Sequence, residues 1–275
     1  MRIDDTWGEK ALEIVKDINA NVLATSLNRS YSHDECKQFD LIASCTTGTD
    51  HIDNRDIPLI SLKGETDFLQ DVWATAEHTW ALIMALIRNV PWAYQDVCQG
   101  NWEREKWQGT ELHGKTLGIV GYGRVGQQVA RFAEAFGMDI MIYDPNHPLG
   151  ESYLNTVLRR SDIVTVHVPL NDKTRGMFGI NQFAQMKPTA YFVNTSRGAV
   201  VNEDALVNIL FHKLIAGAAI DVVENEPHIP HNLGSLAKYG KRLIITPHIS
   251  GCTTESREKT QLFIVNKIKE YVNDL

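Results

Sequence analysis

The 275-residue chain has 27 basic and 34 acidic residues, a formal net charge of −7, and 43% hydrophobic residues. This composition is that of a globular protein with one large or two modest domains. The acidic balance disfavours nucleic acid as a partner, because nucleic-acid binding calls for a basic surface. The longest apolar run, 80–87, is shorter than the roughly 20 residues that cross a bilayer, and no signal peptide is expected. We therefore expect a cytoplasmic protein with no membrane partner.

The cysteines and histidines give no metal-binding pattern. The four cysteines form no CxxC pair and are expected to be reduced thiols: Cys36, Cys45, Cys98 and Cys252. His228 and His231 lie close in sequence, but no HExxH motif or carboxylate cluster accompanies them. No metal is predicted.

The first 90 residues hold a weak α/β pattern followed by one strong helix. A helix is predicted over 11–17, and strands are predicted over 21–26 and 41–44. The segment 76–90 predicts a long apolar helix, which is expected to be the first crossing between the two parts of the chain.

Short apolar runs then alternate with helical patterns as far as residue 246. Strands are predicted over 117–120, 140–143, 163–168, 191–193, 216–222 and 243–246. Helices are predicted over 124–136, 152–160, 181–186 and 203–212. Apolar strands separated by helices predict a parallel sheet that is covered on both faces.

The last segment, 255–271, predicts an amphipathic helix with Leu262, Val265 and Ile268 on one face. Because this helix follows the completed sheet, we expect it to pack on the N-terminal part. The fold class is then α/β, with a doubly wound sheet domain over 76–251 inserted into a smaller domain made of 1–75 and 252–275. Two chain crossings suit a hinged cleft that encloses a substrate.

A glycine-rich turn lies between the first strand and helix of the sheet domain. Gly121, Gly123 and Gly126 fit G-x-G-x-x-G, and Asp144 ends the next predicted strand. This arrangement is typical of dinucleotide binding. Gly121 permits the tight turn, Gly123 lets the backbone approach a pyrophosphate, and Gly126 allows close packing of helix on strand. The helix N-terminus favours the phosphate charge.

Asp144 predicts which dinucleotide binds. Its carboxylate accepts hydrogen bonds from both hydroxyls of an adenosine ribose, and its charge repels a 2′-phosphate. NAD is therefore predicted as the cofactor, rather than NADP. Arg124 either contacts the pyrophosphate or is a solvated residue of the first helical turn.

Three polar residues follow strands of the second half of the sheet. Arg197 follows the strand at 191–193, Glu226 lies past the strand at 216–222, and His248 follows the strand at 243–246. Ligands of an open parallel sheet bind beyond the carboxyl ends of its strands. We therefore expect the three side chains to converge.

Oxidation of an alcohol by hydride transfer requires a base for the hydroxyl proton, and the reverse reaction requires an acid. His248 is the candidate because imidazole titrates near neutral pH. The Glu226 carboxylate would fix the ring and stabilise its protonated form. The Arg197 guanidinium matches a substrate carboxylate and can polarise a keto oxygen.

At these residues the sequence resembles the D-isomer-specific 2-hydroxyacid dehydrogenases. The resemblance runs from about residue 40 to the C-terminus and includes many motifs in order. They are Gly48-Thr49-Asp50-His51-Ile52-Asp53, Ala76-Glu77-His78-Thr79, the glycine-rich turn, His167-Val168-Pro169-Leu170, Asn194-Thr195-Ser196-Arg197-Gly198, Asp221-Val222, Glu226-Pro227 and Pro247-His248-Ile249. The resemblance implies a Rossmann domain inserted into a flavodoxin-like domain, and a homodimer.

The resemblance also implies roles for further residues. Asp221 looks like the residue that holds the nicotinamide carboxamide, and Thr47 and Gly48 look like the loop that takes the substrate carboxylate. The other residues implied to bind the cofactor are Val125, Val168, Pro169, Thr195, Ser196 and Gly251. His78 is interpreted as an interface or hinge residue rather than as catalytic.

The substrate remains open between two branches of this family. The run 101–112 looks closest to 3-phosphoglycerate dehydrogenases, and the alternative is a glyoxylate or hydroxypyruvate reductase. The carboxylate of Glu226 argues against formate, since formate dehydrogenases of this fold carry Gln there. A non-catalytic NAD-sensing scaffold is a further alternative, against which the intact Arg197, Glu226 and His248 argue. The N-terminal segment is short for the family, so the smaller domain is expected to be trimmed.

Overall fold

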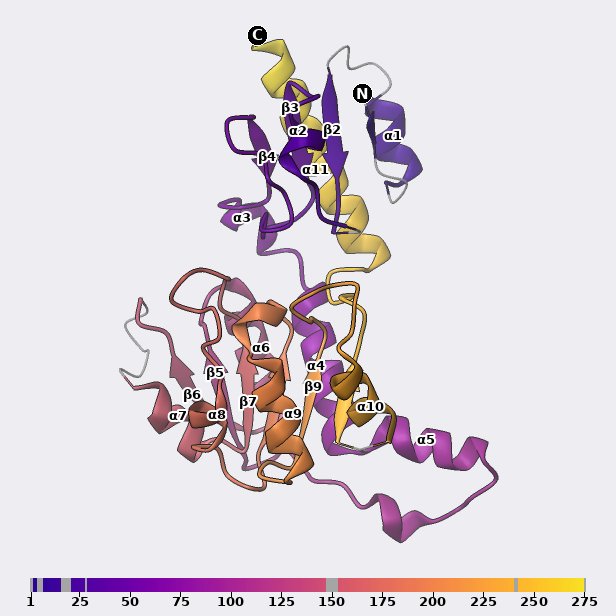
Figure 1. Cartoon of the computed structure of the whole chain (residues 1–275), viewed down its shortest axis with the longest axis vertical. Coiled ribbons are helices and arrows are strands. Elements are labelled where there is room, and N and C mark those ends of the chain that lie inside the picture. The colour runs from indigo at the N-terminus through magenta and orange to yellow at the C-terminus, as the bar shows by residue number, and fades with distance from the viewer. Residues whose placement is uncertain are drawn as a thin grey trace. The chain divides into compact units, whose positions relative to one another are not determined.

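The computed structural model describes residues 2–3, 7–15, 21–27, 29–146, 153–239 and 242–274. The chain divides into two compact units, which we call the outer unit (1–72 and 251–275) and the inner unit (73–250). The chain passes from the outer to the inner unit after residue 72 and returns after residue 250, so both chain termini belong to the outer unit (Figure 1).

The outer unit contains a four-stranded parallel sheet. Its strands are β1 (Arg2–Ile3), β2 (Val22–Thr25), β3 (Leu41–Ser44) and β4 (Leu59–Ser61), in the order β1-β2-β3-β4. Each neighbouring pair is parallel. The order is sequential over the described residues, so the reversal at the first strand that a flavodoxin-like order requires is not seen there. The two-residue β1 pairs only with β2 and forms an edge, the usual place for a very short strand.

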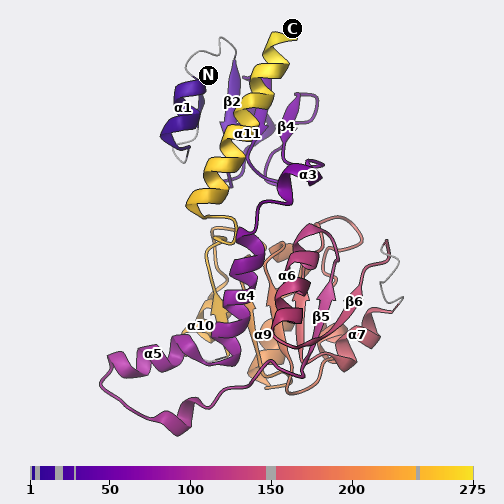
Figure 2. The same ribbon diagram turned by 180° about the vertical axis from the view of Figure 1, so that it is seen from behind.

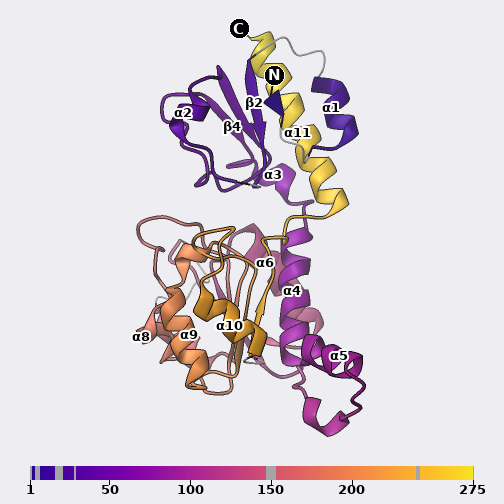
Figure 3. The ribbon, with the colours of Figure 1, turned by 45° about the vertical axis from the view of Figure 1, so that its right-hand side comes forward.

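The helices of the outer unit cover this sheet. They are α1 (Glu9–Val15), α2 (His33–Cys36), α3 (Thr66–Leu69) and α11 (Thr254–Asn273). Ile264, Val265 and Ile268 of α11 are fully buried in one cluster with Trp7 and Leu41. The C-terminal helix therefore packs on the N-terminal part, as the sequence predicted. Figure 3 shows α11 running along the sheet beside α1.

The inner unit contains a six-stranded parallel sheet. Its strands are β5 (Thr116–Val120), β6 (Asp139–Tyr143), β7 (Ile163–Val166), β8 (Tyr191–Asn194), β9 (Gly217–Ile220) and β10 (Leu243–Ile245). The order β10-β9-β8-β7-β5-β6 reverses at β5, which pairs with both β6 and β7. Ligands of doubly wound sheets bind beyond the carboxyl ends of the strands at such a reversal.

Helices cover both faces of the inner sheet. They are α4 (Ala74–Ile87), α5 (Val90–Cys98), α6 (Arg124–Ala135), α7 (Leu154–Arg160), α8 (Ile180–Phe183), α9 (Glu203–Phe211) and α10 (His231–Tyr239), with 3-10 helices η1 (Arg104–Trp107) and η2 (Gly198–Val200). One buried cluster joins α4 and α6 to the sheet, and another joins α7, α8, α9 and α10 to the opposite face. Figure 2 shows α4 and α6 on their shared face.

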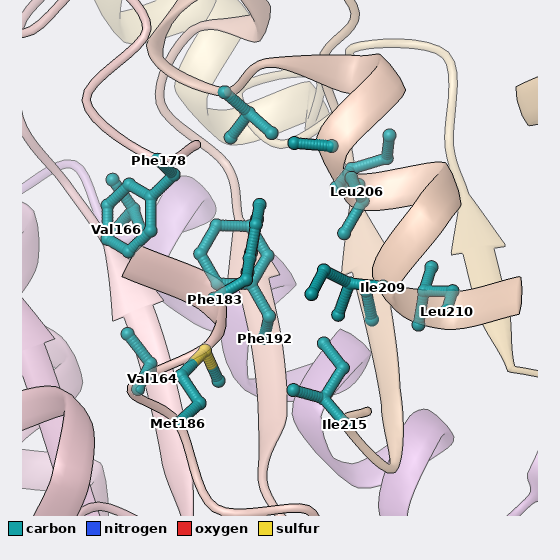
Figure 4. Close-up of a cluster of buried hydrophobic side chains, with 14 of the residues drawn as sticks. Val164, Val166, Phe178, Phe183, Met186, Phe192, Leu206, Ile209, Leu210 and Ile215 are labelled. Carbon is teal, nitrogen blue, oxygen red and sulfur yellow. The ribbon is translucent and has the colours of Figure 1, made fainter. Parts of the chain in front are cut away.

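The cluster on the second face is centred on three phenylalanines. Phe178, Phe183 and Phe192 are fully buried, with ring centroids 5.0 to 6.0 Å apart in tilted or edge-on arrangements. Leu206 and Ile209 of α9 pack against them (Figure 4). This packing fixes η2 and α9 and hence the position of β8, the strand that Arg197 follows.

The element boundaries differ from the sequence predictions at three informative places. The helix predicted over 76–90 ends at Ile87, because Asn89 adopts a left-handed φ of 56° and caps a new helix, α5, which carries Pro91 in its first turn. The strand predicted over 163–168 ends at Val166. The next residue, His167, still donates its N–H to the Val120 carbonyl at the end of β5, but β5 then turns away at the glycine-rich turn and offers no further partner. The strand predicted over 216–222 ends at Ile220.

The other predicted elements are present, with ends that shift by a few residues. The helix predicted over 181–186 is α8, which ends at Phe183, and the strand predicted over 41–44 is β3. Asp17 and Ser152, at the ends of two predicted helices, lie outside the described residues. No helix among the described residues is long and apolar enough to cross a membrane.

Replacing Phe183 by Ala should lower the free energy of unfolding by about 3–5 kcal/mol, because the substitution leaves a cavity among buried rings. Urea unfolding followed by tryptophan fluorescence measures the loss. Phe211→Ala, at an exposed ring of α9, is the matched control and should change stability by less than about 0.5 kcal/mol. Equal losses in the two variants would contradict the central position of Phe183.

Candidate active site at the carboxyl edge of the inner sheet

The glycine-rich turn after β5 has the geometry expected for a phosphate-binding turn. Gly121 has a left-handed φ of 94°, and a Cβ there would lie 2.7 Å from the backbone of His167. At Gly126 a Cβ would lie 2.2 Å from the Gly121 carbonyl oxygen, so only glycine lets α6 approach the strand this closely. At Gly123, the residue before α6, a Cβ would meet nothing within 4 Å. Packing therefore does not require that glycine, and its missing side chain leaves open space at the helix N-terminus.

Asp144 closes this turn from the next strand. Its Oδ2 accepts a hydrogen bond of 2.9 Å from the Tyr122 N–H, and its Oδ1 accepts one of 2.9 Å from the Asn146 N–H. The carboxylate is thus fixed at the carboxyl end of β6, beside the turn. Arg124 is half-buried and contacts Gln128, and burial lowers the pKa of its guanidinium. Val125, also half-buried, packs into the cluster under α4 and α6.

Val168 and Pro169, both predicted to contact a cofactor, follow β7. The Val168 N–H lies at the turn, because a Cβ on Gly121 would come within 2.8 Å of it. Pro169 is exposed, and its carbonyl accepts a hydrogen bond of 2.6 Å from the Thr174 hydroxyl. Burial lowers the pKa of His167 to about 3, so this imidazole stays neutral at physiological pH.

Backbone hydrogen bonds tie the ends of β8, β9 and β10 together. The Asp221 N–H donates to the Asn194 carbonyl at 2.9 Å, and the Asp221 carbonyl accepts from the His248 N–H at 2.8 Å. The three strand ends therefore continue the sheet order past the last ladder residues. This arrangement holds the segments that carry Arg197 and His248 at the same edge of the sheet.

His248 and Glu226 form a hydrogen-bonded pair. Nδ1 of His248 lies 2.6 Å from Oε2 of Glu226, and the Val223 N–H donates to Oε1 of the same carboxylate at 3.1 Å. A carboxylate accepts hydrogen bonds, so the proton of the pair lies on Nδ1 and leaves Nε2 for another partner. The imidazole side chain is 15% exposed and the carboxylate 32%. The pair is therefore partly open to solvent.

Arg197 lies at the start of η2, where the backbone is tightly packed. A Cβ on the next residue, Gly198, would come within 2.0 Å of the Val223 carbonyl carbon, so η2 lies directly on the loop that leads to Glu226. The buried Asn194 side chain donates to the Arg197 carbonyl at 3.0 Å and accepts from the Ser196 N–H and hydroxyl. Nη1 of Arg197 donates to the Ser196 carbonyl at 2.8 Å.

Asp221 is the most heavily hydrogen-bonded carboxylate of this edge. Although burial favours its neutral form, hydrogen bonds from His78, Thr246 and the N–H groups of Ile249 and Ser250 hold the pKa of Asp221 below its ordinary value. Its side chain is fully buried. The ionised carboxylate therefore anchors the backbone on the C-terminal side of His248.

Two polar residues of α4 reach this edge and were not assigned to it from the sequence. The hydroxyls of Thr79 and Thr195 lie 2.8 Å apart, and His78 contacts Thr246 and Asp221. The interpretation of His78 as an interface or hinge residue missed this contact. A usable signal was present, since three adjacent polar residues, Glu77, His78 and Thr79, precede the continuous apolar run of the same helix.

The remaining predicted site residues belong to the outer unit. Thr47 is exposed and Gly48 half-buried in the loop after β3, where the Thr46 hydroxyl donates to the Gly48 carbonyl at 2.8 Å. Gly251 begins the C-terminal part of the outer unit. Among the residues that the structure describes, no group of three or more His, Cys, Asp or Glu side chains could hold a metal ion.

The lowered pKa of Asp221 predicts the pH dependence of folding. Its carboxylate stabilises the folded state above the pKa of the unfolded carboxyl, about 3.9, and this contribution is lost as pH falls through the folded-state value. Asp221→Asn should cost about 1–3 kcal/mol at pH 7, because buried N–H groups lose an acceptor.

Urea unfolding at several pH values measures this loss, with the exposed Asp172→Asn as control. The difference between wild type and Asp221→Asn should shrink below pH 4. A difference that grows on acidification would contradict a stabilising carboxylate.

Residues 80–250 match the family described as D-isomer specific 2-hydroxyacid dehydrogenase, NAD binding domain. The D-3-phosphoglycerate dehydrogenase of Methanocaldococcus jannaschii is 35% identical over 279 residues, which cover 95% of this chain and 51% of the relative. The glyoxylate reductase of Pyrococcus furiosus is 38% identical over 270 residues, which cover 91% and 78%. The chain thus spans about half the length of the first relative and more of the second.

Solved structures agree with these sequence matches. The D-lactate dehydrogenase of Aquifex aeolicus, crystallised with NAD and lactic acid, is 25% identical with a TM-score of 0.81, covering 97% of this chain and 91% of that one. The pyruvate reductase of Chlamydomonas reinhardtii is 26% identical with a TM-score of 0.82, covering 96% and 86%. The chain therefore belongs to the D-isomer-specific 2-hydroxyacid dehydrogenase family, and residues 80–250 are its NAD-binding domain.

Proposed function

We propose that this protein is an NAD-dependent oxidoreductase that interconverts a D-2-hydroxy acid and the corresponding 2-keto acid. The observation that carries the proposal is the 2.6 Å pair of His248 and Glu226 at the carboxyl edge of the sheet. An imidazole fixed through Nδ1 presents Nε2 as a proton donor or acceptor, which an alcohol–ketone interconversion needs.

The residues at the glycine-rich turn fit NAD. The open space at Gly123 and the N-terminus of α6 suit a pyrophosphate, and the fixed carboxylate of Asp144 suits the two hydroxyls of the adenosine ribose. Arg124 and Val125 flank this site in the first turn of α6. Val168, Pro169, Thr195, Ser196, Asp221 and Gly251 complete the proposed cofactor contacts. A nicotinamide bound by these residues would supply or accept the hydride.

The three catalytic residues then have separate tasks. The Arg197 guanidinium binds the substrate carboxylate with its planar fork and polarises the carbonyl. His248 holds a proton at Nε2 and delivers it to the keto oxygen during reduction, or takes it from the hydroxyl during oxidation. Glu226 keeps the ring oriented, because its carboxylate accepts the hydrogen bond from Nδ1 of His248 at 2.6 Å.

The substrate proposal extends to the outer unit. Thr47 and Gly48 are proposed to bind the substrate carboxylate through the loop after β3. Both a 3-phosphoglycerate dehydrogenase activity and a glyoxylate or hydroxypyruvate reductase activity agree with the relatives named above. Arg29 is a basic side chain of the outer unit that could bind the second anionic group of a phosphorylated substrate. Its guanidinium already pairs with Glu35 at 2.7 Å and lies over the Tyr31 ring, so it does not favour that substrate.

The proposal includes a cytoplasmic homodimer. The four cysteines are free thiols, which suits a reducing compartment. Large apolar side chains on α5 and in the segment after it are exposed: Val90, Tyr94, Val97 and Trp102. Such a group of exposed side chains supports a protein interface.

A steady-state screen of 2-keto acids with NADH tests the function directly. Absorbance at the nicotinamide band should fall with glyoxylate, hydroxypyruvate or a phosphorylated three-carbon keto acid. NADH binding, seen as quenching of tryptophan fluorescence, without reduction of any keto acid would favour a non-catalytic NAD-sensing scaffold instead.

His248→Ala should reduce kcat by roughly 10²–10⁴-fold, the usual contribution of a general acid or base. NADH should still bind, because the proposed dinucleotide contacts come from other residues. His212→Ala, at an exposed imidazole after α9, is the control and should keep full activity. Full activity of His248→Ala would refute the acid–base role.

Asp144→Ala should weaken NADH binding by about 1.5–3 kcal/mol, the contribution of hydrogen bonds to a charged group. NADPH binding should weaken little or become stronger, because the charge that repels the 2′-phosphate is gone. The ratio of kcat/KM with NADH to kcat/KM with NADPH should therefore fall. Asp139→Ala changes a carboxylate at the other end of the same strand and should leave the ratio unchanged. An unaltered ratio in Asp144→Ala would contradict the ribose contact.

A further inference from the structure

His78 of α4 is hydrogen-bonded to the buried polar cluster beneath His248. Its Nε2 lies 3.1 Å from the Thr246 hydroxyl and 3.4 Å from Oδ1 of Asp221. The Thr246 hydroxyl in turn donates to Oδ1 of Asp221 at 2.6 Å. A hydroxyl has one proton, and Thr246 gives it to Asp221. Nε2 of His78 therefore faces only acceptor atoms and must carry a hydrogen, which it donates to the Thr246 hydroxyl with Oδ1 of Asp221 also close by.

We propose that His78 is a positioning residue, whose Nε2–H fixes Thr246 and Asp221 and, through them, the backbone that carries His248. The inference rests on the proposed function, since it concerns the same imidazole. His78 acts through Thr246 and Asp221, so it is not itself a catalytic residue.

Asp221 transmits this contact to both sides of His248. Its carboxylate accepts the N–H groups of Ile249 and Ser250 at 3.0 and 2.8 Å, and its carbonyl accepts the N–H of His248. The carboxylate and the carbonyl of Asp221 thus both determine the path of the chain at His248. A shift of the Asp221 carboxylate would move the imidazole with it.

The position of His78 suits this task. The side chain of His78 is 19% exposed and that of Asp221 is fully buried, so their hydrogen bonds form in a low-dielectric environment where they are stronger. The helix that carries His78 is anchored by Ile83 and Leu86, which are buried in the cluster on its face of the sheet. The helix therefore provides a fixed point for the loop.

The Nε2–H can be observed without any activity measurement. At pH 8, nitrogen NMR of the histidine-labelled protein, assigned with a His78 variant, should show a proton on Nε2 of His78. A spectrum with Nε2 unprotonated and the proton on Nδ1 would overturn the hydrogen-bond direction and with it the proposal.

Kinetics test the consequence. His78→Leu should lower kcat by roughly 10- to 100-fold, the cost of misplacing a catalytic group by about 1 Å. The fluorescence-derived Kd for NADH should change less than kcat. His78→Gln should recover most of the activity, because the Gln amide nitrogen can occupy the position of Nε2, whereas the shorter His78→Asn should not. His212→Leu is the matched control and should keep wild-type kcat.

A double variant separates positioning from general damage. His78→Leu with Thr246→Val should lose no more kcat than the worse single variant, because both substitutions break one chain of hydrogen bonds. Multiplied losses would overturn the proposal, as would wild-type kcat in His78→Leu or equal losses in the Gln and Asn variants. If His78→Leu does not fold, the Gln and Asn pair still gives the comparison.

The two proposals fail in different ways. If the wild-type protein reduces no keto acid, the proposed function fails, and the NMR measurement still decides whether His78 carries the Nε2–H on which the positioning role depends. If the wild type turns over and His78→Leu matches it, only the positioning role is overturned.

Discussion

A single buried carboxylate organises the carboxyl edge of the inner sheet. Asp221 links the ends of β8, β9 and β10 through its own N–H, carbonyl and side chain, and it stays ionised because four donors surround it. A buried charge without such partners would be strongly destabilising. Displacing any one donor from the carboxylate therefore costs free energy, and this cost holds each donor in place. The edge thus forms one cooperative network, from Asn194 on one strand to Ser250 beyond another. At the glycine-rich turn, the missing side chains of Gly121 and Gly126 permit the close approach, and the Asp144 carboxylate holds the turn through the Tyr122 N–H.

The sequence predicted the elements and residues that leave a local pattern. The apolar strands, the glycine spacing and the carboxylate of Asp144 each depend on residues close in the chain, and the structure has the turn and Asp144 in contact through Tyr122. The pair of His248 and Glu226 was expected from chemistry rather than from pattern, and the two side chains do meet. The polar residues of α4 could be noticed in the sequence, but the partner of His78 could not be predicted. Thr246 lies 168 residues away, and no periodicity relates the two. The end of the long apolar helix at Ile87 and the start of α5 at Val90 were also missed, and the left-handed backbone of Asn89 separates the two helices.

The polar residues of α4 explain why this helix differs from an ordinary covering helix. Its apolar side chains bury the face of the sheet, while His78 and Thr79 direct hydrogen bonds to the strand ends. The Thr79 hydroxyl donates to the Thr75 carbonyl, so the Thr195 hydroxyl must donate its own proton to Thr79. The direction of the Thr195 hydroxyl is therefore set from the helix, whereas the Asp221 carboxylate sets that of the Thr246 hydroxyl. A helix without Thr79 would leave the Thr195 hydroxyl without this acceptor.

The backbone of His248 shows what this order costs and what it achieves. Its φ of 53° lies in the left-handed region, which costs a residue other than glycine about 1–3 kcal/mol. Glycine would remove the strain but also the imidazole, so the fold has to hold a strained histidine. Hydrogen bonds to Asp221 offset the cost of this strained backbone torsion. They come from the N–H of His248 itself and from the N–H groups of Ile249 and Ser250, which follow it. Because the carboxylate of Glu226 then restrains the ring, backbone and side chain of His248 are fixed independently. An imidazole held in this way presents Nε2 in one direction, which a residue that exchanges a proton with a bound substrate requires.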